Sequence, residues 1–165
     1  MDAAIWGLIG TIVGALASIG TTWLAGRGAH TLQQEKSRED RAERASAFQR
    51  QTLLDLQEAI HDALRLVNRA HIEDSEAHRQ TKEWGKNMLS DEVNEGIRLA
   101  LRRVSILVER VADDELRSRV KNLMSGATQV LLSRNEQESR FYIEKISDDA
   151  RQVFEEVGAV LRHHY

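Results

Sequence analysis

Apolar and charged residues are sharply separated along this 165-residue chain. From Ala3 to Gly26 there is no charged residue, whereas Asp, Glu, Lys and Arg make up 30% of the whole sequence. Beyond Gly26 the apolar residues return at intervals of three and four, which is the period of helices with one buried face. The pattern therefore predicts two kinds of segment, one continuous apolar stretch and a set of amphipathic helices.

The uncharged segment has the length of a transmembrane helix. A bilayer core about 30 Å thick needs about 20 apolar residues in a helix, and Ala3 to Gly26 supplies 24. Trp6 and Trp23 lie 17 positions apart, close to the spacing of the two membrane interfaces where tryptophan collects. We therefore expect a single membrane span over residues 3–26, which makes the lipid bilayer the first expected partner.

The uncharged segment has two alternative interpretations, a cleaved signal peptide and a buried helix of a soluble domain. Ala15-Leu16-Ala17 matches the small-x-small pattern of a signal-peptide cleavage site, which would make the chain a secreted helical protein. However, the chain begins Met1-Asp2 without a positive charge, and its apolar run exceeds the usual core of about 7–15 residues. A buried helix of a soluble domain is rarely apolar on all sides over this length.

Basic residues on one side of the span predict its direction. No Lys or Arg precedes it, whereas Arg27, Lys36, Arg38, Arg41 and Arg44 follow it. Because basic flanks stay on the cytoplasmic side, we expect a single-pass protein of the inner (plasma) membrane with its N-terminus outside and its C-terminal part in the cytoplasm. The expected membrane-interface anchors are Trp6, Trp23 and Arg27.

Small residues recur every four positions within the span, at Gly10, Gly14, Ser18 and Thr22. This spacing places them on one helix face and lets another backbone approach closely. The pattern predicts a helix-packing face for a homo-oligomer or a partner span. The alternative is that glycine is simply more frequent in membrane helices than in soluble ones.

The remaining chain predicts a polar segment followed by a helical bundle. Residues 27–52 are expected to form a polar juxtamembrane helix or linker, and residues 53–165 the bundle, either as separate elements or with the first bundle helix continuing the polar one as a single rod. A break is expected between Ile72 and Ser90, with Trp84 and either Met88 or Leu89 packed on the core. The first bundle helix has its apolar stripe at Leu53, Leu56, Ile60, Leu64, Val67 and His71.

Three further amphipathic helices are expected after this break. Ser90 is the expected N-cap of the first, Asp113 or Asp114 of the second, and Ser147 a restart point within the last. We expect an all-α protein whose three or four bundle helices pack antiparallel within one chain, the alternative being a coiled coil between subunits. The expected stripes are Val93, Ile97, Leu101, Val104, Leu107 or Val108, and Val111; then Leu116, Val120, Leu123, Ala127 and Leu131; then Phe141, Ile146, Ala150, Val153, Val157 and Val160 or Leu161.

Composition excludes several classes of chemistry. The chain has no cysteine, so disulfides, thiolate metal sites and Cys nucleophiles are absent. Its net charge of −3 disfavours nucleic-acid binding. Neither a GxSxG elbow nor a phosphate-binding loop occurs. We therefore expect a protein that is not an enzyme and has no catalytic, cofactor-binding or metal-binding residues.

Three polar patterns contain metal-ligating residue types, but none predicts a metal site. Glu58 and His61 form a single Glu-x-x-His, whereas a di-metal bundle needs two. The terminal pair His163-His164 lies where chains fray. Acidic clusters near residues 113–115 and 148–149 are explained by helix N-terminal electrostatics.

The layout resembles that of small bacterial, actinobacterial-type membrane proteins with one span, a small-residue stripe, an Arg-rich exit and a cytoplasmic helical bundle. The stretches that carry the resemblance are IWGLIGTIVGALASIGTTWLAGR, VADDELRSRVKNL and DDARQVFEEVGAVLR. The group brings no known activity, so the resemblance implies an architecture and assigns no residue a catalytic role. The exit helix of this chain is more acidic than in the commonest form, which weakens an anionic-lipid interpretation.

These observations favour a single-pass membrane-anchored protein that presents a cytoplasmic bundle for self-association, through span or bundle, or for binding an unknown protein partner. One alternative function is a holin-like or toxin-like protein that permeabilises the membrane through oligomerised spans. The small-residue face is compatible with both. The size of the bundle argues for the first.

Overall fold

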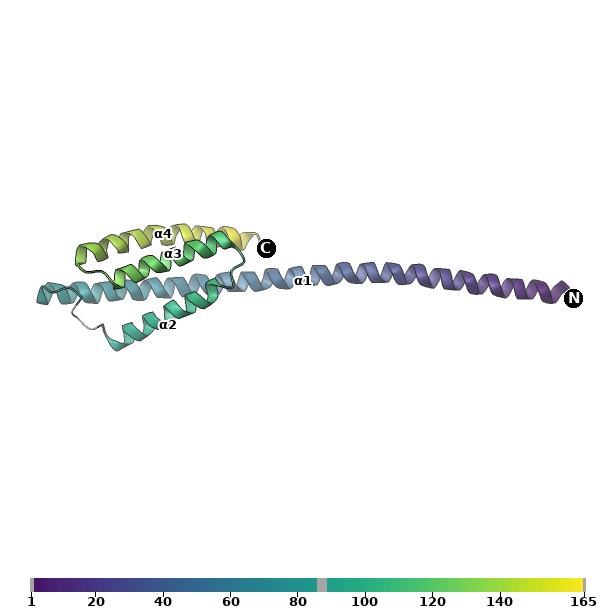
Figure 1. Cartoon of the computed structure of the whole chain (residues 1–165), viewed down its shortest axis with the longest axis horizontal. Coiled ribbons are helices and arrows are strands. Elements are labelled where there is room, and N and C mark those ends of the chain that lie inside the picture. The colour runs from purple at the N-terminus through teal and green to yellow at the C-terminus, as the bar shows by residue number, and fades with distance from the viewer. Residues whose placement is uncertain (1, 86–88, 165) are drawn as a thin grey trace. The chain divides into compact units, whose positions relative to one another are not determined.

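The computed structural model describes the backbone of residues 2–85 and 89–164, and the side chains of residues 33–85 and 89–164. Within these ranges the protein is all-α, with no strand, and the predicted fold class is confirmed at that level. Figure 1 shows the four helices, α1 (Asp2–Thr81), α2 (Asp91–Val108), α3 (Asp114–Leu131) and α4 (Glu136–Arg162).

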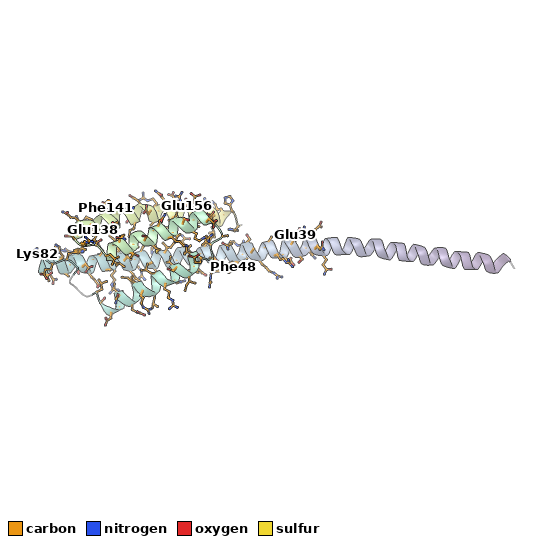
Figure 2. All side chains as sticks on the ribbon, in the orientation of Figure 1. Glu39, Phe48, Lys82, Glu138, Phe141 and Glu156 are labelled. Carbon is orange, nitrogen blue, oxygen red and sulfur yellow. The ribbon has the colours of Figure 1, made fainter. Side chains whose placement is uncertain are left out.

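The chain divides into two compact units, Met1–Ala45 and Ser46–Tyr165. In the first unit, the described side chains of residues 33–45 are exposed apart from the half-buried Ser37. Glu39, labelled in Figure 2, is one of these exposed side chains. This stretch is therefore helical without a buried face.

The second unit is an antiparallel bundle in which successive helices alternate in direction (Figure 1). Its core is made within one chain, which confirms the helical bundle predicted from the apolar stripes. Four of the six predicted core positions of the first bundle helix are buried, and the other two, Leu64 and His71, are half-buried. The largest fully buried side chains come from all four helices: Leu53, Leu56, Ile60, Val67, Val93, Val104, Leu116, Val120, Leu123, Val153 and Val157.

Packing is uneven within the bundle. α3 and α4 approach closely at Gly126, where an added Cβ would lie 2.8 Å from Ile146 Cγ2. The first half of α2 packs in a small separate cluster, where Val93 and Ile97 are buried with Ala70 of α1. The core of the unit therefore has two parts, a large cluster shared by all four helices and a small one at the start of α2.

The predicted break between Ile72 and Ser90 is confirmed. α1 ends at Thr81, the chain leaves the helix at Lys82 and Gly85, both with positive φ (59° and 68°), and α2 begins at Asp91. Ser90 is the N-cap residue of α2, as predicted, but its hydroxyl makes no capping hydrogen bond and lies 3.4 Å from the Glu73 carboxylate. The predicted cap at Asp113 is confirmed, since its carboxylate accepts a hydrogen bond from Leu116 N at 2.8 Å.

The last helix also differs from its prediction. Asn135 caps α4 by accepting from Glu138 N at 2.8 Å, and the helix runs through Ser147 without a restart. Phe141, near the start of α4 in Figure 2, is 60% exposed rather than buried. The buried face at this end instead passes through Ser139 and Ile146, which are seven residues apart and therefore lie on one side of the helix.

The expected core packing of the connection after α1 is confirmed for Leu89, which packs against the small cluster around Ala70, while Met88 lies outside the described residues. Trp84 is half-buried, and its indole Nε1 donates to Ser133 O at 2.9 Å, but its ring is not part of either apolar cluster. Across the residues with described side chains, the structure contains no helix both long and apolar enough to cross a membrane. The span predicted over residues 3–26 lies outside that range and stays a prediction.

Candidate functional site

The residues predicted to act at the membrane fall where side chains are not described. These are the packing face of Gly10, Gly14, Ser18 and Thr22 and the anchors Trp6, Trp23 and Arg27. Their backbone belongs to α1. Their proposed roles therefore depend on the sequence pattern alone.

The Glu58-x-x-His61 pair lies on an exposed part of α1. The Glu58 carboxylate accepts a hydrogen bond from Arg103 of α2 at 2.8 Å, so it serves an ion pair between two helices. His61 lies beside Leu54, Gln57 and Phe154 in a surface groove between α1 and α4. Among the described side chains, no three His, Cys, Asp or Glu residues are placed to hold a metal ion.

The other acidic and histidine patterns also make local or structural contacts. Asp113 caps α3, and Asp114 pairs with Arg117 one turn later. His164 accepts a hydrogen bond at its backbone oxygen from Ser46 Oγ at 3.1 Å, which fastens the end of the chain to α1. Two of these contacts are local to the start of α3 and one joins the end of α4 to α1, so the groups do not converge on one site.

A polar cluster at the far end of the bundle was missed by the sequence analysis. His71 Nδ1 lies 2.7 Å from Ser139 Oγ, which links the end of α1 to the start of α4. The Trp84 ring lies beside two imidazoles, with centroid separations of 6.1 Å to His71 and 5.8 Å to His78. The seven-residue spacing of the two histidines was the available signal, whereas nothing in the sequence paired either one with Ser139.

Burial dominates the electrostatics of this cluster. It lowers the pKa of His71, and the positive charge of Arg140 lowers it further, while Glu136 and Asp74 act in the opposite direction. Burial likewise raises the pKa of Asp74. Both shifts favour the neutral form of a group that is partly removed from water.

The Ser139–His71 contact resembles a nucleophile with its base, but its setting is structural. A catalytic serine must reach a substrate carbonyl, with donors arranged around the developing oxyanion. Ser139 is only 1% exposed and lies within the core-facing side of α4. The contact therefore serves as a buried link between α1 and α4.

A polar groove of about 770 Å³ runs between α3 and α4. Arg119 and Lys145 bring positive charge to its walls and Asp149 brings negative charge. Arg119 is already engaged by Glu115 at 2.9 Å and by Glu156 at 3.0 Å. The groove therefore combines mixed charges with a neutralised guanidinium and has no concentrated charge of either sign.

A second groove, about 390 Å³ in volume, lies between α1 and α2. It is lined by Leu99 and Ile106, which are 51% and 49% exposed, and by Asp55, Arg102 and Arg103. We call Asp55, Leu99, Arg102, Arg103 and Ile106 the α1–α2 face. Its mixture of aliphatic and charged side chains suits protein contact better than chemistry.

Comparison with known proteins adds no relative. No family model, no curated protein and no solved structure matches the chain.

Proposed function

We propose that this chain is a single-pass inner-membrane protein, not an enzyme, that holds a helical bundle at the cytoplasmic surface for association with itself or with a protein partner. The observation that carries the proposal is the uncharged stretch from Ala3 to Gly26, with tryptophans near both ends and basic residues only after it. These are the features of a span with a defined direction.

The bundle supports a binding role over a catalytic one. Polar side chains in it pair with one another, as in the Glu58–Arg103 and His71–Ser139 contacts. Two half-exposed aliphatic side chains, Leu99 and Ile106, lie by contrast on the α1–α2 face. The resemblance to small actinobacterial-type membrane proteins agrees with this architecture.

Fractionation of cells that express the full chain with a C-terminal reporter tests the anchor. We expect the protein in the membrane pellet after alkaline extraction, with the reporter active in the cytoplasm. Leu16→Arg places a charge in the middle of the segment, where it costs about 2.5–3.5 kcal/mol of insertion free energy, and should move protein to the soluble fraction. Leu16→Phe is the matched control. Wild-type protein in the soluble fraction would overturn the proposal.

Two further measurements on the same cells separate the alternatives. The mass of the purified chain shows whether the N-terminus is retained, and a shortened chain would support the secreted alternative. Membrane potential during induced expression should be unaffected. A collapse of the potential would instead support a holin-like protein that permeabilises the membrane.

A further inference from the structure

We propose that the far end of the bundle is an acid-sensitive junction, in which uptake of a proton by His71 breaks its bond to Ser139 and lets the end of α1 separate from the start of α4. The inference goes beyond the proposed function, because every residue that it uses lies within the bundle and it does not depend on a membrane anchor. Figure 2 labels Lys82, Glu138 and Phe141 near this end.

The two helix segments that meet at this junction are sparsely buried. Residues 71–81 of α1 are half-buried at most, and Ser139 is the one buried residue between positions 136 and 145 of α4. The nearest buried apolar residues of the two helices are Ala70 and Ile146, just outside these segments. The 2.7 Å contact between His71 Nδ1 and Ser139 Oγ is therefore the buried link of the junction.

The hydroxyl of Ser139 is directed differently from that of other helical serines. Ser147, for example, donates to Ile143 O at 2.8 Å, the carbonyl four residues earlier. Among the described contacts Ser139 makes no such bond, and its hydroxyl has His71 Nδ1 as its partner. A neutral imidazole that carries its proton on Nε2 can accept the hydroxyl hydrogen at Nδ1.

A second proton on the His71 ring removes this acceptor. Both imidazole nitrogens are then donors, so the Ser139 hydroxyl must turn its hydrogen away from Nδ1. Ser139 is only 1% exposed, so water is not at hand to replace the lost partner. Because a buried polar group without its partner costs free energy, protonation weakens the link between α1 and α4.

Charged groups of both helices face His71. Arg140 of α4 opposes a positive charge on the imidazole, whereas Glu136 of α4 and Asp74 of α1 favour one. Glu136 is also engaged by Arg140 at 3.1 Å. Burial is the largest influence, and the pKa of His71 is lowered in the folded protein. Separation of the helices returns the ring to water and binds the proton more readily, so acid favours the open junction.

Trp84 bridges the two sides of the junction. Its indole Nε1 donates to Ser133 O, just before α4, at 2.9 Å. Its ring centroid lies 6.1 Å from that of His71 and 5.8 Å from that of His78, the other titratable group beside it. Within the described residues, His78 Nδ1 and Ser75 Oγ are buried without a hydrogen-bond partner. Such groups lower the cost of opening this end locally, relative to the apolar core.

The opposite end of the bundle is fastened by a side chain that does not titrate. Gln49 of α1 donates from Nε2 to Arg110 O at 3.0 Å, and its Oε1 accepts from Ala112 N at 3.1 Å. A carboxamide keeps both its donor and its acceptor in acid. Acid should therefore open the junction at His71 and leave the contacts of Gln49 in place.

Acrylamide quenching of Trp84 fluorescence tests the junction. Trp6→Phe and Trp23→Phe leave Trp84 as the one tryptophan of the full chain, which would be purified in detergent. Fluorescence lifetimes at each acrylamide concentration separate accessibility from quenching by the nearby imidazoles. We expect the accessibility of Trp84 to rise as the pH falls from about 7.5 to 5.5, while the far-UV circular dichroism stays unchanged.

Two substitutions at the link should act in opposite directions. His71→Gln can still bond Ser139 but does not titrate, so Trp84 should stay protected at both pH values. Ser139→Ala removes the link, so Trp84 should be accessible at both. The control His61→Gln, at an exposed position of α1, should retain the response to pH. Phe48→Trp in a chain with Trp84→Phe reports on the opposite end of the bundle and should show no response.

Several outcomes would overturn the proposal. One is a Trp84 accessibility that does not change with pH, and another is a response that persists in His71→Gln or is lost only in His78→Gln. Protection of Trp84 in Ser139→Ala would show that the link does not hold the junction. Loss of helix in acid, or an equal response in Phe48→Trp, would show general unfolding in place of local opening.

Discussion

α1 contains two stretches whose helical state has different physical causes. Residues 33–45 expose almost every side chain, whereas residues 53–70 bury a complete stripe that includes Leu53, Leu56 and Val67. Isolated helices of this length are marginal in water, and most helical stability in proteins comes from packing. The first stretch therefore depends on local helix propensity, while the second is stabilised by the bundle core. Substitutions should consequently have unequal effects in the two stretches.

The largest expected difference is between two neighbouring leucines. Leu53 is fully buried and Leu54 is 44% exposed. Leu53→Ala should lower the free energy of unfolding by about 2–5 kcal/mol, because it removes buried methyl groups and leaves a cavity. Leu54→Ala should change it by less than about 1 kcal/mol. Urea denaturation followed by circular dichroism measures both, and equal losses would show that the two side chains are similarly packed.

Glycines extend the comparison of packed and open positions to α3 and α4. A Cβ at Gly126 would lie 2.8 Å from Ile146 Cγ2, whereas at Gly158 the nearest atom is Arg162 Nη1 at 3.6 Å. Gly126→Ala should cost about 1–3 kcal/mol through overpacking, partly offset by the better helix propensity of alanine. Gly158→Ala should stabilise the protein by up to about 1 kcal/mol. Thermal unfolding of the two variants would reveal shifts of opposite sign, and a stabilised Gly126→Ala would contradict the close approach of α3 and α4.

Periodicity predicted the bundle well because the buried stripes are nearly unbroken along each helix. It failed at Phe141 because α4 buries Ser139 instead, and a polar residue on a core face is invisible to an apolar count. The link from His71 to Ser139 joins residues 68 positions apart, and no local pattern carries such a pairing. The α1–α2 face was missed for a related reason, since the apolar period does not reveal that Leu99 and Ile106 are each about half exposed in the fold.

The pH dependence of stability sharpens the comparison between the buried far end and the exposed surface. The pKa of His71 is lowered in the folded protein, chiefly by burial, so the unfolded chain binds a proton more readily. His71 therefore contributes stability above its usual pKa of about 6.5 that is lost as the pH falls through and below that value. The raised pKa of Asp74 has the opposite effect on stability. It lowers the free energy of unfolding as the pH rises above the usual titration range of a carboxyl group.

We expect the free energy of unfolding to fall between about pH 7.5 and 5.5, and His71→Gln to reduce that slope, because glutamine can still bond Ser139 but does not titrate in this range. Urea titrations at several pH values measure the slope. His61→Gln, at an exposed position on α1, is the control and should leave the slope as it is. A wild-type slope in His71→Gln would assign the pH dependence to another group.

The smallest expected effect concerns the exposed stretch of α1. Ala42→Gly costs about 1 kcal/mol of local helix propensity, but Ala42 buries nothing, so the urea midpoint of the bundle should not move. Ala59→Gly makes the same chemical change at a fully buried position and should lower that midpoint through both propensity and packing. Hydrogen exchange should show faster exchange near residue 42 in the first variant, with the bundle amides unaffected. If Ala42→Gly instead weakened the bundle as much as Ala59→Gly does, the stretch from 33 to 45 would contribute tertiary stability, and the two parts of α1 would not differ in the way described.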